Sequence, residues 1–135
     1  MAHNIHLAAL SANAMADAIA ARCNGGTIKI YSGTQPSSGD DGIGAAVLLA
    51  TCTFGTPAFG AAVAGVATAN AIGQDADADT TGVAAWIRVL SSAAAPVYDG
   101  TAGVGPSFDC DIPTTTVVQH QAFPVNSLTF TMPES

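Results

Sequence analysis

The amino-acid sequence predicts a mainly β protein, an antiparallel β-sandwich or jelly roll with one N-terminal α-helix. Two observations carry this prediction. The first 23 residues are rich in alanine and place apolar side chains at helical spacing, whereas short apolar runs separated by Gly, Pro and Asp follow Asn24-Gly25-Gly26. A chain of 135 residues also suits one compact unit. We therefore expect an N-terminal arm and helix over residues 1–24 and a jelly-roll-like sandwich over residues 25–135.

The N-terminal segment predicts a helix from Ile5 to Cys23. Asn4 is a suitable N-cap, and Asn24-Gly25 is a suitable stop because both residue types tolerate the left-handed conformation. The residues expected on the apolar stripe of this helix are Leu7, Leu10, Ala14, Met15, Ala18 and Ile19. Because the stripe is thin, two arrangements stay open: the helix packs on its own β domain, or it is an arm that reaches a neighbouring subunit.

Seven or eight short strands are expected after the helix. In the first, which begins at Thr27, we expect Ile28 and Ile30 to face inward and Lys29 and Tyr31 to face outward. The turn-rich residues 32–44 predict a long surface loop. The later strand candidates are residues 47–54, 65–72, 83–90, 97–98 with 101–104, 115–119 and 127–132.

The candidate strand over residues 83–90 is expected near the core. It contains Trp86, the only tryptophan of the chain, and it alternates least strictly between apolar and polar residues. We expect Arg88 on its solvent or interface face.

The charge balance argues against nucleic-acid and membrane partners. Three basic residues stand against ten acidic ones, for a net charge of −7, so phosphate backbones and anionic membranes should repel the protein. No apolar run is long enough to predict a membrane span. Charged residues make up only 10% of the chain, and such a charge-poor surface is commonly covered by a partner. We therefore expect an oligomer or a larger assembly.

The cysteines indicate a reducing compartment. Cys23, Cys52 and Cys110 are odd in number and widely spaced, and the N-terminal stretch does not have the pattern of a signal peptide, because Asn13 and Asp17 interrupt it. We expect reduced thiols in a protein made in a cytosol.

Two groups of residues offer metal ligands. Asp75, Asp77 and Asp79 alternate with alanine, but in an extended strand they would lie roughly 7 Å apart on one face, so a solvated acidic loop is favoured and a calcium site stays open. His3 and His6 lie one helical turn apart, and we favour an arm with neutral histidines over a metal site. No resident metal or cofactor is expected.

The sequence contains few residues that could carry out catalysis. His120 is the only histidine outside the N-terminal segment, and no Gly-x-Ser-x-Gly motif is present. Asp109 and Asp111 flank Cys110, where we interpret them as charges that protect a strand edge. The prediction is that the protein is not an enzyme.

Several blocks of the sequence resemble a known family. These blocks are residues 26–36 (GTIKIYSGTQP), 48–51 (LLAT), 57–60 (PAFG), 81–89 (TGVAAWIRV) and the ending from Val125 to Met132. In this order they resemble the capsid cement or decoration proteins of tailed bacteriophages, which are small virion proteins with a jelly-roll-like β domain. The likeness covers most of the chain.

This resemblance implies a structural role. It implies a homo-dimer or homo-trimer, made in the host bacterial cytoplasm, that binds the outer surface of the phage head. There it would bridge neighbouring subunits of the major capsid protein and stabilise the shell, without any cofactor.

The residues expected at the capsid and self-interfaces come from the arm, the helix, the first loop and the Trp86 strand. They are His3, Ile5, Leu7, Leu10, Tyr31, Gln35, Pro36 and Arg88. An alternative function is a head-fibre or tail-associated recognition module that binds a host-surface glycan, since jelly rolls also serve as lectins. One Trp and two Tyr offer few platforms for stacking sugar rings.

Overall fold

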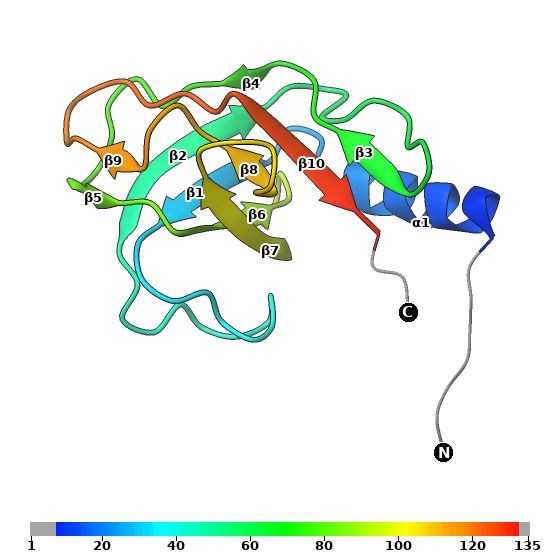
Figure 1. Cartoon of the computed structure of the whole chain (residues 1–135), viewed down its shortest axis with the longest axis horizontal. Helices are drawn as coiled ribbons and strands as arrows, with labels where there is room; N and C mark the ends of the chain where they lie inside the picture. The colour runs from blue at the N-terminus through cyan, green and yellow to red at the C-terminus, as the bar shows by residue number, and fades with distance from the viewer. Residues whose placement is uncertain (1–7, 133–135) are drawn as a thin grey trace.

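A computed structural model describes residues 8–132, which form a mainly β fold with one helix (Figure 1). The elements are α1 (Ala9–Arg22), β1 (Thr27–Tyr31), β2 (Leu48–Phe54), β3 (Val66–Thr68), β4 (Ile72–Gly73), β5 (Gly82–Val83), β6 (Trp86–Leu90), β7 (Pro96–Gly103), β8 (Cys110–Asp111), β9 (Thr116–Val117) and β10 (Ser127–Thr131). The expected fold class is thus confirmed at the level of a mainly β chain with an N-terminal helix.

Most strands belong to one large curled sheet. Its eight strands follow the order β3-β10-β8-β7-β6-β1-β2-β4, and only residues 69–71 separate the two edge strands β3 and β4 along the chain. The sheet therefore curls back toward its own starting edge. Strands β5 and β9 form a separate pair at the end of the long axis opposite α1 (Figure 1).

The expectation of purely antiparallel pairing is wrong at one place. Strands β7 and β8 pair in parallel, with Ala102 opposite Cys110 and Gly103 opposite Asp111. The reason lies at Asp109, whose carboxylate accepts hydrogen bonds from the backbone N–H of Thr101 at 3.0 Å and from its hydroxyl at 3.1 Å. These bonds bring the chain back beside β7 in the same direction, so the sheet is mixed.

The core lies around the central strands β1 and β6. All five residues of β6 are buried, and β1 lies between β2 and β6 in the sheet. Ile28 and Ile30 are fully buried, as expected. The outward placement of Tyr31 is wrong, because this side chain is only 6% exposed.

The helix begins later than the sequence predicts. Ala8 occupies the N-cap position without a side-chain hydrogen bond, and the helix runs from Ala9, four residues after the expected start at Ile5. Asn4, the expected cap, lies outside the described residues. At the other end, Arg22 is the last helical residue, Cys23 is the C-cap and Gly25 has a positive φ of 69°. The expected stop at Asn24-Gly25 is confirmed to within a residue.

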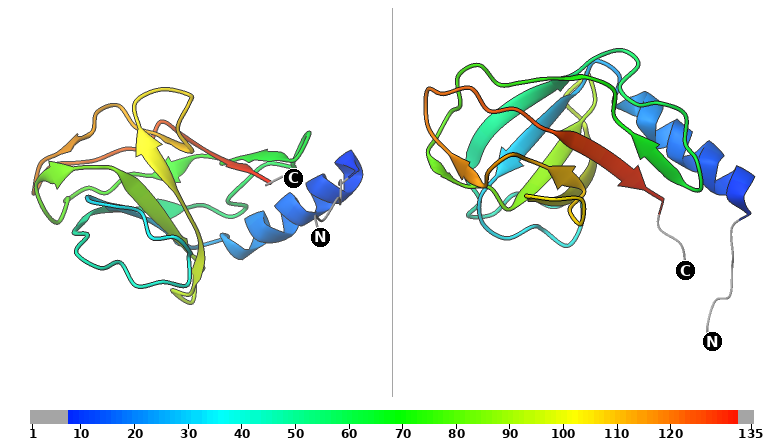
Figure 2. Two further views of the ribbon diagram at one scale, coloured as in Figure 1. Left: turned by 60° about the horizontal axis from the view of Figure 1, so that its bottom comes forward. Right: turned by 45° about the horizontal axis from the view of Figure 1, so that its top comes forward.

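The buried face of α1 differs from the predicted stripe. Ala12, Ala16 and Ala20 are the buried residues, whereas Leu10 is 83% exposed and Met15 is 46% exposed. Small methyl side chains let the helix lie close to β3 and β10, which α1 contacts, and α1 lies beside β3 in both views of Figure 2. The larger apolar side chains are left on the outside.

Three polar side chains at the helix hold it to the β domain. Oδ1 atoms of Asn13, Asp17 and Asn24 accept hydrogen bonds from the backbone N–H groups of Gly65 (2.8 Å), Ala62 (2.8 Å) and Ala58 (2.7 Å), respectively. The connection between β2 and β3 has few strand partners, so these bonds satisfy donors that the sheet leaves unpaired. Of the two arrangements left open by the sequence, the structure shows the helix packed on its own domain.

Candidate functional site

The expected N-terminal contact residues divide into two groups. His3, Ile5 and Leu7 lie outside the described residues. Leu10 lies in the first turn of α1 on its solvent side, together with Ala14, Met15, Ala18 and Ala21, all of which are exposed. We call these five residues the outer face of α1. None of these five side chains is charged, and the exposed Arg22 follows on the same side in the last turn of the helix. Asn13 and Asp17 hold the opposite side of the helix to the β domain.

Tyr31 is buried within the chain rather than exposed on its surface. Its ring stacks on Trp86 with the centroids 4.6 Å apart, and the indole N–H of Trp86 donates to the carbonyl oxygen of Ser32 at 3.1 Å. The two residues are directly opposite each other across β1 and β6. This pair packs the start of the first loop against the sheet, so Tyr31 has a structural position.

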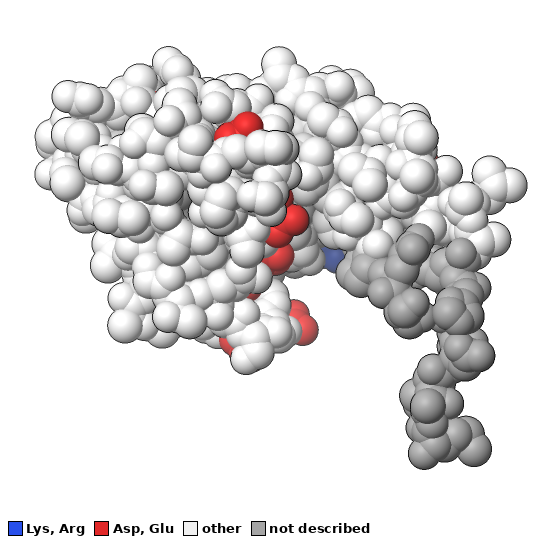
Figure 3. All heavy atoms as spheres, viewed as in Figure 1, with Lys and Arg blue, Asp and Glu red and all other residues white. Residues whose placement is uncertain are grey.

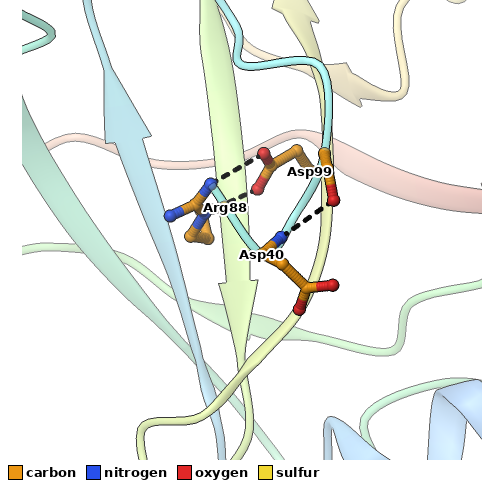
Figure 4. A network of polar contacts seen from close by, with 4 residues as sticks. Asp40, Arg88 and Asp99 are labelled. Atoms are coloured by element: carbon orange, nitrogen blue, oxygen red, sulfur yellow. Dashed lines mark hydrogen bonds and ion pairs between the residues drawn. The ribbon is translucent and has the colours of Figure 1, made fainter. Parts of the chain in front are cut away.

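Arg88 is also buried, which corrects its expected exposure. Its guanidinium makes a bidentate ion pair with Asp99, from Nε at 2.7 Å and Nη2 at 3.0 Å (Figure 4), and the two side chains are only 9% and 4% exposed. Arg88 lies opposite Asp99 across β6 and β7, and its guanidinium carbon is 5.6 Å from the centre of the Trp86 ring. Hydrogen bonding to Asp99 raises the pKa of Arg88. The pair is a fixed internal contact.

Gln35 and Pro36 lie on the surface, as expected. They line two neighbouring pockets of about 390 and 410 Å³ at the first loop. The first of these pockets also contains Asp40 together with Tyr98 and Asp99 of β7. The loop thus brings its exposed residues next to the ion pair of Arg88.

A groove between β7 and β10 was not predicted from the sequence. It holds about 210 Å³ and is lined by Tyr98, Asp99, Asp109, Thr129, Phe130 and Thr131. Tyr98 and Asp99 are shared with the first loop pocket, so the two hollows adjoin. Acidic atoms gather along this part of a surface that is otherwise almost uncharged in this view (Figure 3). The one sequence signal was Asp99, an acid placed directly after an apolar strand candidate.

The three aspartates at 75, 77 and 79 do not converge on an ion. Asp75 accepts hydrogen bonds from the backbone N–H groups of Thr51 at 2.8 Å and Asp77 at 2.9 Å. Asp77 pairs instead with His120 Nδ1 at 2.9 Å, and both side chains are more than two-thirds exposed. Among residues 8–132 no three His, Cys, Asp or Glu side chains are grouped as metal ligands. Asp75 has a structural role in this loop.

Asp109 and Asp111 bind backbone groups in addition to flanking β8. Asp109 holds Thr101, as described above, and Asp111 accepts a hydrogen bond from the N–H of Gly105 at 2.9 Å. The two carboxylates therefore fix the loop between β7 and β8.

No helix in the described residues is long and apolar enough to cross a membrane.

The three cysteines are free and buried. Burial raises the pKa of Cys23 and Cys52 from an ordinary value of 9.0 to about 11, and that of Cys110 to about 12. The thiolate is the nucleophilic form of cysteine, so these side chains are poorly suited to covalent catalysis.

The buried thiols predict a loss of stability in alkali. The unfolded chain releases the thiol protons near pH 9.0, whereas the folded chain keeps them until about pH 11 or 12. The free energy of unfolding is therefore unaffected by the thiols below about pH 9 and falls as the pH rises from 9 to the folded pKa values. Urea denaturation should show the free energy of unfolding falling by about 2 kcal/mol per thiol between pH 8 and pH 10.5.

The control for this experiment is a Cys110→Val variant, which lacks one of the three buried thiols. Its loss of stability over the same pH interval should be smaller than that of the natural chain. A free energy of unfolding that stays constant up to pH 10.5 would contradict the assignment of three buried, protonated thiols.

Comparisons with protein-family models, with curated proteins and with solved structures find no match to this chain. The fold and the surfaces described above therefore carry the functional argument.

Proposed function

We propose that the chain is a structural virion protein, a capsid cement or decoration protein that binds the outside of a phage head. In this proposal it bridges neighbouring subunits of the major capsid protein and stabilises the shell. The observation that supports it best is the outer face of α1, whose five side chains are uncharged and include the 83% exposed Leu10, on a helix that its own domain holds in place. A rigid apolar projection of this kind suits docking on another protein.

The opposite end of the molecule supports a bridging role. Val83 is 62% exposed and Val118 is 42% exposed, and they lie on or beside the β5-β9 pair at the far end of the long axis from α1 (Figure 1). Apolar side chains are thus available at both ends. One end can contact the shell while the other contacts a second copy, in a homo-dimer or homo-trimer.

The sequence and the charge also fit this proposal. The blocks that resemble cement proteins fall on β1, β2, β5, β6 and β10 and on the connections beside them, so the curled sheet would be the jelly-roll-like domain of that family. A net charge of −7 suits an outer surface better than the DNA-facing interior. Each contact would be modest, and the repeated lattice of a shell would multiply it.

The glycan-binding alternative gains no support from the described residues. Trp86 and Tyr31 are buried against each other, and Tyr98 packs on Phe130 with the ring centres 4.9 Å apart. Phe108, at 37% exposed, is the one aromatic side chain of residues 8–132 that counts as exposed. The surface of the described residues therefore offers few aromatic rings on which a sugar could stack.

The outer face of α1 provides the test of the proposal. A Leu10→Gln/Met15→Gln variant should bind capsids that lack the protein at least tenfold more weakly than the natural chain, because it removes the largest apolar side chains of this face. Co-sedimentation over a range of protein concentrations measures the affinity. Both positions are exposed, so the fold should be unaffected.

The matched control is Val104→Gln, which changes a 58% exposed side chain on the loop after β7. This variant should bind as the natural chain does. If all three proteins bind capsids equally well, the outer face of α1 is not the docking surface. If none binds, the cement assignment itself fails.

A further inference from the structure

The position between β7 and β10 in the large sheet is occupied by a strand along only part of its length. Strand β8 consists of two residues, and it pairs with β7 on one side and with β10 on the other. Because β8 lies between them, β7 and β10 are two inter-strand spacings apart, roughly 10 Å. Beyond Asp109 the position between them contains the groove described above, while β7 continues for residues 96–101 and β10 for residues 129–131. The first loop approaches the outer face of β7 at this place, where a Cβ atom on Gly39 would lie 3.9 Å from the backbone nitrogen of Asp99.

Backbone donors point into this groove from both sides. The N–H of Thr101 in β7 donates to Asp109 Oδ2, and the N–H of Thr129 in β10 donates to the carbonyl oxygen of Asp109 at 3.0 Å. Two residues further along each strand, the N–H groups of Asp99 and Thr131 face the same side. Neither has a hydrogen-bond partner on that side among the described residues. Asp109 thus ends the filled part of the position, and open strand edges follow it.

The two faces of the groove differ in chemistry. Tyr98 and Phe130 pack against the core and form its floor. Asp99 points to the opposite face, on the side of Arg88, and Asp40 lies in the adjoining pocket. Arg88 is already bound to Asp99, and no hydrogen-bond partner within the described residues engages the carboxylate of Asp40. The outer rim of the groove therefore carries a negative charge at Asp40.

We propose that this groove binds an extended peptide segment of a partner protein, which adds as a strand between β7 and β10 in line with β8. The open strand edges supply main-chain hydrogen bonds on both sides, as in other cases of strand addition. The alternation of a strand then sets the side chains: small apolar residues toward Tyr98 and Phe130, and basic residues toward the outer rim, where the exposed carboxylate of Asp40 lies in the adjoining pocket. The partner segment is therefore extended, with alternating apolar and basic residues.

Peptide binding to the purified chain tests this inference without any capsid. The probes are fluorescein-labelled KVKVK, its acidic counterpart EVEVE, and KVKVK with N-methylated valines, read by fluorescence anisotropy at low salt. KVKVK should bind at least roughly tenfold tighter than EVEVE, and N-methylation should abolish binding because the methylated nitrogens donate no hydrogen bond. On binding KVKVK, the amides of Asp99 and Thr131 should exchange hydrogen at least roughly tenfold more slowly.

Two charge variants distinguish binding at the groove from a general attraction between the basic peptide and the acidic protein. Asp40→Asn should weaken KVKVK binding by roughly two- to fivefold, whereas Asp79→Asn, with the same charge change away from the groove, should leave it unchanged. Equal affinity for KVKVK and EVEVE, retained binding after N-methylation, or binding without protection of Asp99 and Thr131 would each overturn the proposal. So would the absence of binding up to about 1 mM. Capsid binding fails or succeeds independently of these outcomes.

Discussion

A Gly26→Ala variant is expected to lose more than about 4 kcal/mol of its free energy of unfolding, or to fail to fold. A Cβ atom at this position would lie 2.0 Å from the carbonyl oxygen of Leu90 and 3.0 Å from that of Cys23. Both neighbours are backbone atoms, so no side-chain rotation relieves the clash. Gly26 joins α1 to β1 beside the end of β6, and the substitution would therefore force the helix and the sheet apart. Urea denaturation followed by circular dichroism measures the effect.

Gly42→Ala is the control for this substitution. Nothing lies within 4 Å of a Cβ atom at Gly42, so the free energy of unfolding should change by less than about 0.5 kcal/mol. A Gly26→Ala protein that is as stable as Gly42→Ala would show that the helix does not lie against the sheet as described.

An Arg88→Met variant is expected to lose about 3 to 5 kcal/mol of stability. The substitution keeps a long apolar side chain beside Trp86 but leaves the carboxylate of Asp99, which is 4% exposed, without its cationic partner. An uncompensated charge at a buried position is the main source of the loss. The midpoint and slope of urea denaturation measure it, and an unchanged slope would indicate that the fold is retained.

Two further variants separate the unpaired charge from other effects. Arg88→Met/Asp99→Leu removes both charges and should recover most of the lost stability. Asp77→Ala breaks the pair with His120, whose side chains are both more than two-thirds exposed, and should change stability by less than about 0.5 kcal/mol. The buried-pair account would be wrong if Arg88→Met were no more harmful than Asp77→Ala.

The sequence predicted the parts of the fold that depend on local patterns. The end of α1 at Asn24-Gly25 follows from backbone preferences, and the burial of Ile28 and Ile30 follows from their alternation. The buried face of the helix was not predictable in the same way. Size alone favours burying Leu10 and Met15, but the space between α1 and the β3-β10 surface admits alanine, and Asn13 and Asp17 fix the rotation of the helix.

The exposure of Tyr31 and Arg88 was mispredicted for one shared reason. Alternation in a strand assumes that one face of the sheet is solvated. Here the first loop folds back over the outer face: Trp86 donates to Ser32, and Gly39 lies close to the backbone of Tyr98. Side chains that alternate outward are therefore buried under the loop. Such a contact joins residues far apart in the chain, and strand periodicity carries no information about it.

The groove between β7 and β10 could not be predicted from the sequence pattern either. It exists because Asp109 binds Thr101, which places β8 parallel to β7 and lets the strand begin only at Cys110. In the sequence, Asp109 and Asp111 were interpreted only as charges at a strand edge. Their carboxylates instead shape a loop, and the open strand edges of the groove follow from that shape.

Capsid binding by the natural chain tests the central claim most directly. Capsids prepared without the protein should bind it saturably, with a fixed number of copies per shell, and the loaded capsids should release their DNA at a higher temperature than the unloaded ones. A decoration protein that bridges capsid subunits predicts both results. Failure to co-sediment with the capsids, or saturable binding that leaves the temperature of DNA release unchanged, would contradict a stabilising role on the shell.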